Sequence, residues 1–390
     1  MERDQSIFRQ KLQEEMEKQG FDALLLTRAE NIFYATGYCS RYAYDGQAGN
    51  TIAILPRHGN PYIICSQFEV MAVEKETSGV RTAVFDTWMY IEDFLDKGEK
   101  PTQPDHNVAF RMAVDALCQN EQTIKKLGVD KVFLPYERAA FLIDTFGRGC
   151  LRDCSAVFAA ARAIKTPWEI EVLRQNAKLS EAQFKETMPK IHVGMTEEEI
   201  MQLFVIAGHK QSPDVLGIRQ AHSVGSYYAP IYVPRKHPLQ NGDVVRLDGG
   251  VVRLGYISDI ARTIAVGDGV SKKKQEIFDL MLETLDLGFS MIGPDVKCAD
   301  VYKAMLAKIQ AKIPEFIRGH FGHSTGCIRG EEAPFISLSN PGTFQPGMVF
   351  CMETPYYSST NGSYAMEDTF LITDNGYERF AYTNRSIWGY

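Results

Sequence analysis

The chain has no excess of basic residues and no long apolar run. Its 390 residues carry 42 Lys and Arg against 49 Asp and Glu, a formal net charge of −7. Because a nucleic-acid or anionic-membrane surface needs a basic excess, we expect neither partner. No stretch approaches the roughly 20 apolar residues that span a bilayer. The charged start Met-Glu-Arg-Asp-Gln is unlike a secretory signal, so we expect a cytoplasmic protein.

The sequence also lacks any Cys-x-x-Cys pair, repeat or low-complexity tract. Its eight cysteines are scattered over positions 39, 65, 118, 150, 154, 298, 327 and 351. Such spacing favours isolated buried thiols over a disulfide framework and agrees with a reducing compartment.

Length and element order predict an α/β (α+β) chain of two domains, 1–160 and 161–390. In the first, a helical face over 6–19 ends at Gly20, and short apolar runs at 22–27, 51–55, 61–65 and around 131–134 are typical of strands. The second opens with a helix start at Thr166, Pro167 and Glu169, which have capping-box spacing. Thr196 begins another helix in the same way, and alternating strands follow Gly242.

Five residues with metal-ligand chemistry lie in order along the second domain. Asp248 and Asp259 are eleven positions apart, and a hairpin can bring both side chains to one face. His323 follows a glycine, which permits close approach to a site. Glu353 ends an apolar strand, and Glu367 begins a strand that can pair with it.

Four carboxylates and one imidazole form an oxygen-rich site. Such a site suits two divalent ions, Mn²⁺, Co²⁺, Fe²⁺ or Zn²⁺, that share a water of lowered pKa. A single acidic residue on a strand is usually solvated, and a single histidine is usually structural. Five such residues in strand context favour the metal site over those readings.

The order of these motifs resembles the pita-bread metallopeptidase family, in its prolidase, aminopeptidase P and creatinase branch. The phrases are Gly-Tyr-x-Ser-Asp-Ile at 255–260, Gly-His at 322–323, Pro-Gly-Met-Val-Phe-x-x-Glu at 346–353 and Glu-Asp-x-x-Leu-Ile-Thr at 367–373. Segments 21–37 and 164–171 extend the resemblance over nearly the whole chain. It implies a ribonuclease-H-like N-terminal domain, a C-terminal pita-bread domain and a homodimer, but not a substrate.

Three positions depart from the pattern of the family's peptidases. A histidine expected before the first Asp is Ile231, one expected seven residues after His323 is Gly330, and an arginine expected before Glu367 is Ala365. Such residues bind the scissile amide and move protons, and losing one donor costs on the order of a hundredfold in rate. We therefore expect metal binding to persist while the chemistry differs or other residues take over.

Candidate replacements lie near the same motifs. As catalytic residues we predict His222, Tyr232 and Glu332, with Glu332 as the candidate general base. For substrate binding we predict Tyr227, Tyr228, Arg329 and Arg41. The tyrosines also fit packing, and the charged residues also fit a solvated surface.

The two arginines suggest a carboxylate clamp. Creatinase-like relatives send an arginine from the partner's N-terminal domain into the site, after a Tyr-x-x-Gly phrase, and Tyr38-Cys-Ser-Arg41 is similar. Arg41 of the dimer mate and Arg329 could then bind an anionic small substrate through paired N–H donors.

The leading hypothesis is a metal-dependent hydrolase of a C–N, amide-type bond in a small carboxylate-bearing molecule, with a metal-bridging hydroxide as nucleophile. An Xaa-Pro dipeptidase with replaced surrounding residues is one alternative. A metal-dependent lyase on the same fold is another. A non-catalytic binding module is the last, and the retained ligands argue against it.

Overall fold

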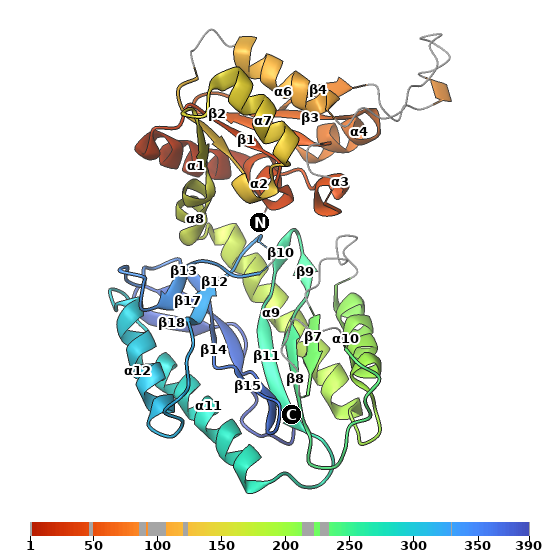
Figure 1. Ribbon diagram of the computed structural model, residues 1–390, viewed down its shortest axis with the longest axis vertical. Helices are drawn as coiled ribbons and strands as arrows, with labels where there is room; N and C mark the ends of the chain where they lie inside the picture. The colour runs from red at the N-terminus through yellow and green to blue at the C-terminus, as the bar shows by residue number, and fades with distance from the viewer. Residues whose placement is uncertain are drawn as a thin grey trace. The chain divides into compact units, whose positions relative to one another are not determined.

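The computed structural model in Figure 1 describes residues 2–46, 50–85, 91–92, 107–119, 124–212, 222–226, 234–328 and 330–389. The chain divides into two compact units, Met1–Arg162 and Ala163–Tyr390. Each combines helices with a sheet, so the expected α/β class is confirmed.

The first unit is built on a six-stranded mixed sheet in the order β4-β3-β2-β1-β5-β6. Its antiparallel centre is formed by β1 and β2 and by β2 and β3, and the remaining pairs are parallel. The strands are β1 Ala23–Leu26, β2 Ile52–Pro56, β3 Tyr62–Ser66, β4 Arg81–Phe85, β5 Leu127–Val129 and β6 Leu151–Asp153. Helices are α1 Gln5–Gln19, α2 Ala29–Thr36, α3 Arg41–Tyr44, α4 Gln67–Glu76, α6 Val108–Gln119, α7 Tyr136–Phe146 and α8 Ser155–Ala163.

Most elements expected in this unit are confirmed, and one is wrong. Helix α1 ends at Gly20 with a φ of 72°, as the glycine predicts. The strand expected around 131–134 is instead β5, four residues earlier, while Lys131–Phe133 form a 3₁₀ turn. The buried Asp130 carboxylate accepts the backbone N–H groups of Thr27 and Arg28, which turns the chain out of the sheet before the apolar run begins.

The second unit is built on an eight-stranded sheet in the order β13-β12-β14-β17-β11-β8-β7, with β18 also beside β17. Its strands are β7 His222–Gly225, β8 Val244–Gly249, β11 Ile260–Ala265, β12 His320–Ser324, β13 Glu332–Ser337, β14 Val349–Glu353, β17 Glu367–Thr373 and β18 Gly376–Arg379. Two small ribbons are β9 Val252–Arg253 with β10 Tyr256–Ile257, and β15 Tyr356–Ser358 with β16 Gly362–Tyr364. The helices are α9 Pro167–Thr187, α10 Glu197–Gln211, α11 Lys272–Met291 and α12 Cys298–Gln310.

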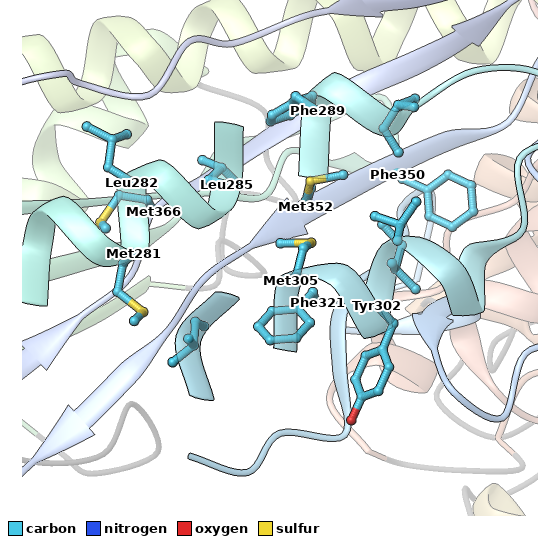
Figure 2. Close-up of a cluster of buried hydrophobic side chains, with 14 of the residues drawn as sticks. Met281, Leu282, Leu285, Phe289, Tyr302, Met305, Phe321, Phe350, Met352 and Met366 are labelled. Atoms are coloured by element: carbon cyan, nitrogen blue, oxygen red, sulfur yellow. The ribbon is translucent and has the colours of Figure 1, made fainter. Parts of the chain in front are cut away.

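Alternation along the strands separates an apolar core from the opposite face. Helices α11 and α12 pack their apolar sides with Phe350, Met352 and Met366, and Figure 2 shows this cluster. Because neighbouring strand residues point to opposite faces, Glu353 and Glu367 project away from that core. A Cβ at Gly288 of α11 would come within 2.5 Å of the Met352 sulfur, so the helix needs glycine for this close approach.

Both predicted capping boxes are present, at Thr166 and Thr196. The capping box at Thr166 is connected to the core through Glu169. One oxygen of Glu169 accepts the Thr166 N–H at 2.7 Å, and the other accepts the Tyr256 hydroxyl at 2.8 Å. Glu169 is 1% exposed. The tyrosine of the Gly-Tyr-x-Ser-Asp phrase therefore secures the start of α9.

Replacing Tyr256 with phenylalanine should lower the free energy of unfolding by about 1–3 kcal/mol, because a buried carboxylate loses a donor. Urea unfolding of the purified protein measures this. Tyr136, which is 87% exposed, provides the matched Tyr→Phe control. Equal stability of the two variants would contradict the role of this hydrogen bond.

Two absences expected from the sequence can be compared with the structure. The eight cysteines are all free, and only Cys39 and Cys118 are not buried, so no disulfide joins them. Within the described ranges no helix is both long and apolar enough to cross a bilayer.

Candidate metal centre

Strand register brings the five predicted ligands onto neighbouring strands. Glu353 on β14 lies directly opposite Glu367 on β17. On the next strand Ala261 pairs with Glu367, and on its other side it pairs with Asp248 of β8. Asp259 immediately precedes β11, and His323 on β12 pairs with Cys351 of β14. The predicted pairing of the strands of Glu353 and Glu367 is confirmed.

Three of the five side chains form a group of the size that holds one metal ion. One ligand atom each from Asp259, His323 and Glu367 lies within 4.8 Å of the others. The His323 Nε2 atom is 3.6 Å from Glu367 Oε1 and 4.0 Å from Asp259 Oδ2. Glu367 Oε1 is buried and has no hydrogen-bond partner in the described parts of the chain. A buried carboxylate oxygen without a donor is costly, and a bound cation would satisfy it.

Crowding of carboxylates in a buried place disfavours their charged forms. Burial, followed by the neighbouring Asp248 charge, raises the pKa of Asp259 from 3.8 to about 7. Burial also raises the pKa of Glu367 well above its usual range, with Asp259 as the next cause. The pKa of Asp248 is raised by burial, against the opposing effect of Arg246. Burial is the largest cause in all three, and the charges of neighbouring carboxylates act in the same direction.

Hydrogen bonds to their backbone carbonyls hold Asp259 and Glu367 in place. The Asp259 carbonyl accepts the Thr369 hydroxyl at 2.9 Å and the Cys351 thiol at 3.4 Å. The Glu367 carbonyl accepts Nη1 of Arg262, a fully buried arginine, at 2.7 Å. Arg262 in turn pairs with Asp368 at 3.1 Å, which gives the Asp of the Glu-Asp phrase a structural role. These contacts fix the backbone at both residues, from which the two carboxylates project.

The other two predicted ligands each contact an arginine, which the sequence analysis missed. Arg246 Nη1 donates to Asp248 Oδ2 at 3.0 Å, and Arg318 Nη2 donates to Glu353 Oε1 at 2.6 Å. Arg246 lies two residues before Asp248 on β8, so both side chains point to the same face. That spacing is visible in the sequence and could have revealed the pair, whereas Arg318 is 35 residues from Glu353 and gives no such signal.

A second group involves residues that were not predicted. His320 lies between two carboxylates, with Nε2 3.0 Å from Glu331 Oε2 and Nδ1 3.5 Å from Glu353 Oε1. The hydrogen bond from His320 lowers the pKa of Glu331 to about 2. These three residues also form a group of metal-binding size. Arg318, however, contacts the same Glu353 oxygen, Oε1, that lies nearest His320.

Only some of the predicted substrate-binding and catalytic residues lie within the described parts of the chain. His222 begins β7, with its backbone opposite Gly249, one residue from Asp248. Glu332 is buried and pairs with Ser324, beside His323. Arg41 begins α3 of the first unit, where its 60% exposed side chain pairs with Asp45 at 2.6 Å. The remaining predicted residues, Tyr227, Tyr228, Tyr232 and Arg329, and also Ile231, lie outside the described residues.

Two of the three departures from the family pattern, Gly330 and Ala365, lie within the described residues. Gly330 is exposed with a φ of 97° and offers no side chain, and Glu331 follows it. Ala365 bonds through its backbone to the hydroxyl of Thr263, whose cross-strand partner is Arg246. Arg246 also donates to Ser363 at 3.1 Å. A guanidinium from β8 therefore lies beside the segment in which an arginine was expected.

Comparison with known proteins agrees with the class that the fold and the acidic centre define, a pita-bread unit preceded by an α/β domain. The family model for metallopeptidase family M24 matches residues 171–374, and that for the creatinase/prolidase N-terminal domain matches residues 9–164. The chain belongs to metallopeptidase family M24, and the resemblance expected from its motifs is confirmed.

Similar chains span the full length. An uncharacterized peptidase of Staphylococcus saprophyticus is 26% identical over 98% of this chain and 99% of its own. Among solved structures, a Thermococcus sibiricus prolidase has a TM-score of 0.84 at 21% identity over both whole chains, and a Bacillus anthracis Xaa-Pro dipeptidase has 0.80 at 21% over 99% of each. The N-terminal domain of the chickpea FACT subunit SPT16 has 0.72 at 16%, over 98% of this chain and 97% of that one. At these identities the structural matches show the fold alone.

Proposed function

We propose that this protein is a divalent-metal-dependent hydrolase that cleaves a C–N bond of the amide type in a small carboxylate-bearing substrate. The observation that carries the proposal is the group of Asp259, His323 and Glu367, with a buried Glu367 oxygen that lacks a donor in the described chain. Membership of a metallopeptidase family supports hydrolysis. We retain Mn²⁺, Co²⁺, Fe²⁺ and Zn²⁺ as candidate ions, since oxygen and imidazole donors suit each of them.

The donor set fits such an ion. Carboxylates whose pKa values are raised by burial and by neighbouring carboxylates become ionised when a cation binds, so metal and protons compete for the same oxygens. When bound, a divalent ion would lower the pKa of water and polarise a carbonyl group. His323 would act as a ligand from a buried, fixed position, since its Nδ1 lies 3.0 Å from the Ser324 carbonyl.

Access for a small substrate is supported by a groove of about 280 Å³ whose lining includes Arg318, which contacts the candidate ligand Glu353. Tyr357, Ile317 and Pro355 also line this groove. Arg318 contacts Glu353 with one terminal nitrogen, while its Nε has no hydrogen-bond partner in the described ranges. A guanidinium can donate through several N–H groups, so Arg318 could orient a substrate carboxylate while it remains bound to Glu353.

The proton in this reaction needs a side chain near the reacting atoms. We keep Glu332 as the proposed general base, with His222 and Tyr232 as further candidates. Glu332 is supported by its burial and by its place opposite Ser324, next to His323. Tyr227 and Tyr228 remain proposed substrate contacts.

We also keep the proposed homodimer, in which Arg41 from one subunit and Arg329 from the other bind the substrate carboxylate. Arg41→Ala and Arg329→Ala should each raise KM at least tenfold with unchanged metal content, since each removes one part of the clamp. Steady-state kinetics with elemental analysis measure both. Arg152→Ala, another exposed arginine of the first unit, is the control. An unchanged KM in both variants would contradict the clamp.

A substrate screen tests the proposed reaction. Metal-loaded protein is incubated with small amides and amidines that carry a carboxylate, and with the dipeptides Ala-Pro and Met-Pro. We expect an amine to be released from the first group. Cleavage of only the dipeptides would instead support an Xaa-Pro dipeptidase, and release of an unsaturated acid would identify a lyase. Metal binding without turnover on any substrate would favour a binding module and contradict the proposal.

A further inference from the structure

Two of the five expected metal ligands already have a cationic partner within the protein. Asp248 is bound by Arg246 at 3.0 Å, and Glu353 is bound by Arg318 at 2.6 Å. Neither belongs to the group of Asp259, His323 and Glu367, whereas Glu353 belongs to the second group, with His320 and Glu331. Of the five expected ligands, Asp259, His323 and Glu367 therefore form one group without an arginine, while Asp248 and Glu353 are each bound by an arginine.

Arg246 is held firmly in this position. Its side chain is 0% exposed, its Nε donates to Ser363 at 3.1 Å, and its Cζ lies 5.8 Å from the centre of the Tyr357 ring. A buried guanidinium that lost its carboxylate would remain as an uncompensated charge. Arg246 would therefore have to lose its partner, or share it, when a cation approached Asp248.

The Glu353 carboxylate is also surrounded by cationic or potentially cationic groups. Arg318 contacts its Oε1 at 2.6 Å, and His320 Nδ1 lies 3.5 Å from the same oxygen. Any ion bound between His320, Glu331 and Glu353 would lie near the positive charge of Arg318, which already contacts this carboxylate. This group is consequently a poor place for a second divalent cation.

Charge counting leads to the same result. Arg246 neutralises Asp248, Arg318 neutralises Glu353, and Glu331 pairs with His320. Asp259 and Glu367 then leave two negative charges when ionised, which one divalent ion neutralises. A second divalent ion would have to compete with Arg246 or Arg318 for its carboxylate.

We propose that the centre binds one divalent ion through Asp259, His323 and Glu367, and that Arg246 and Arg318 take the place of a second ion by neutralising Asp248 and Glu353. This inference rests on the proposed metal-dependent function and replaces the two ions expected from the sequence. One ion and two fixed guanidinium groups would then supply the positive charge that two ions were expected to supply. The arginines would then supply electrostatic stabilisation from positions that do not depend on metal supply.

The test is a titration of the metal-free full chain with Mn²⁺, followed by equilibrium dialysis and electron paramagnetic resonance. The wild-type protein should bind one Mn²⁺ per chain and give the spectrum of an isolated ion. Arg246→Met removes the charge and keeps similar bulk. This variant should bind a second Mn²⁺ at least tenfold more tightly than the wild-type protein does, and give the spectrum of a spin-coupled pair. Arg246→Lys retains the charge and should still bind one ion.

If Arg246→Met does not fold, Arg318→Met serves the same purpose, because Arg318 is partly exposed. Two Mn²⁺ ions of similar affinity in the wild-type protein would overturn the single-ion proposal and leave the proposed function standing. One ion in both wild type and the folded Met variant would overturn the role of the arginines. No Mn²⁺ binding at all would overturn both this proposal and the metal-dependent function.

Discussion

Replacing Glu367 with glutamine is expected to abolish metal retention and to lower turnover by at least about a hundredfold, comparable to losing a donor at a developing charge. Glu367 pairs with Glu353 across the strands and lies 3.6 Å from His323, so it is central to the proposed donor group. An amide oxygen is a much weaker ligand for these ions than a carboxylate. Elemental analysis of the purified variant and a turnover assay measure the two effects.

The same substitution should leave the metal-free protein as stable as wild type or more stable, because it removes one of several mutually repelling carboxyls. This opposite effect on stability separates loss of a ligand from loss of the fold. Glu378→Gln is the control, since Glu378 lies on the same sheet but pairs with Arg174. Full metal retention in Glu367→Gln would contradict the ligand assignment.

The metal-free protein should become less stable as the pH rises from about 5 to 8. The pKa of Asp259 is about 7 in the folded chain and 3.8 ordinarily, so the folded state holds a proton that the unfolded state has released. Stability then decreases with pH in this interval. The raised pKa values of Asp248 and Glu367 act in the same direction.

At about 1.4 kcal/mol per pH unit, the difference at Asp259 corresponds to an effect of about 2–4 kcal/mol, because the neighbouring carboxyls titrate together. Urea unfolding at a series of pH values measures it, with and without saturating Mn²⁺. Added ion should reverse the trend, since it binds the ionised carboxylates and stabilises the folded state. A metal-free protein whose stability rises between pH 5 and 8 would contradict the raised pKa values at this centre.

Local patterns in the sequence predicted much of the fold. The capping box at Thr166 was visible because its hydrogen bonds join residues three positions apart. The strands of Glu353 and Glu367 were visible because an apolar run ends at Glu353 and another follows Glu367. The strand expected at 131–134 was wrong, because its apolar residues follow Asp130, whose contacts with Thr27 and Arg28 lie about a hundred residues away in sequence.

The chemistry of the centre was harder to predict from sequence. Motif order identified the candidate ligands, but their partners depend on distant segments. Arg318 reaches Glu353 from the segment before β12, and His320 lies between Glu331 and Glu353 because β12, β13 and β14 are neighbours. Register irregularities on both sides of His323 also prevent simple alternation from predicting which residues of β12 face the centre.

The most direct test is an anomalous-difference map from crystals of the full chain grown with Mn²⁺. One peak per chain is expected, bounded by Asp259, His323 and Glu367, while Arg246 and Arg318 remain on Asp248 and Glu353. Two peaks in this region would contradict the single-ion centre. A map without a peak at those three residues would contradict the metal centre itself.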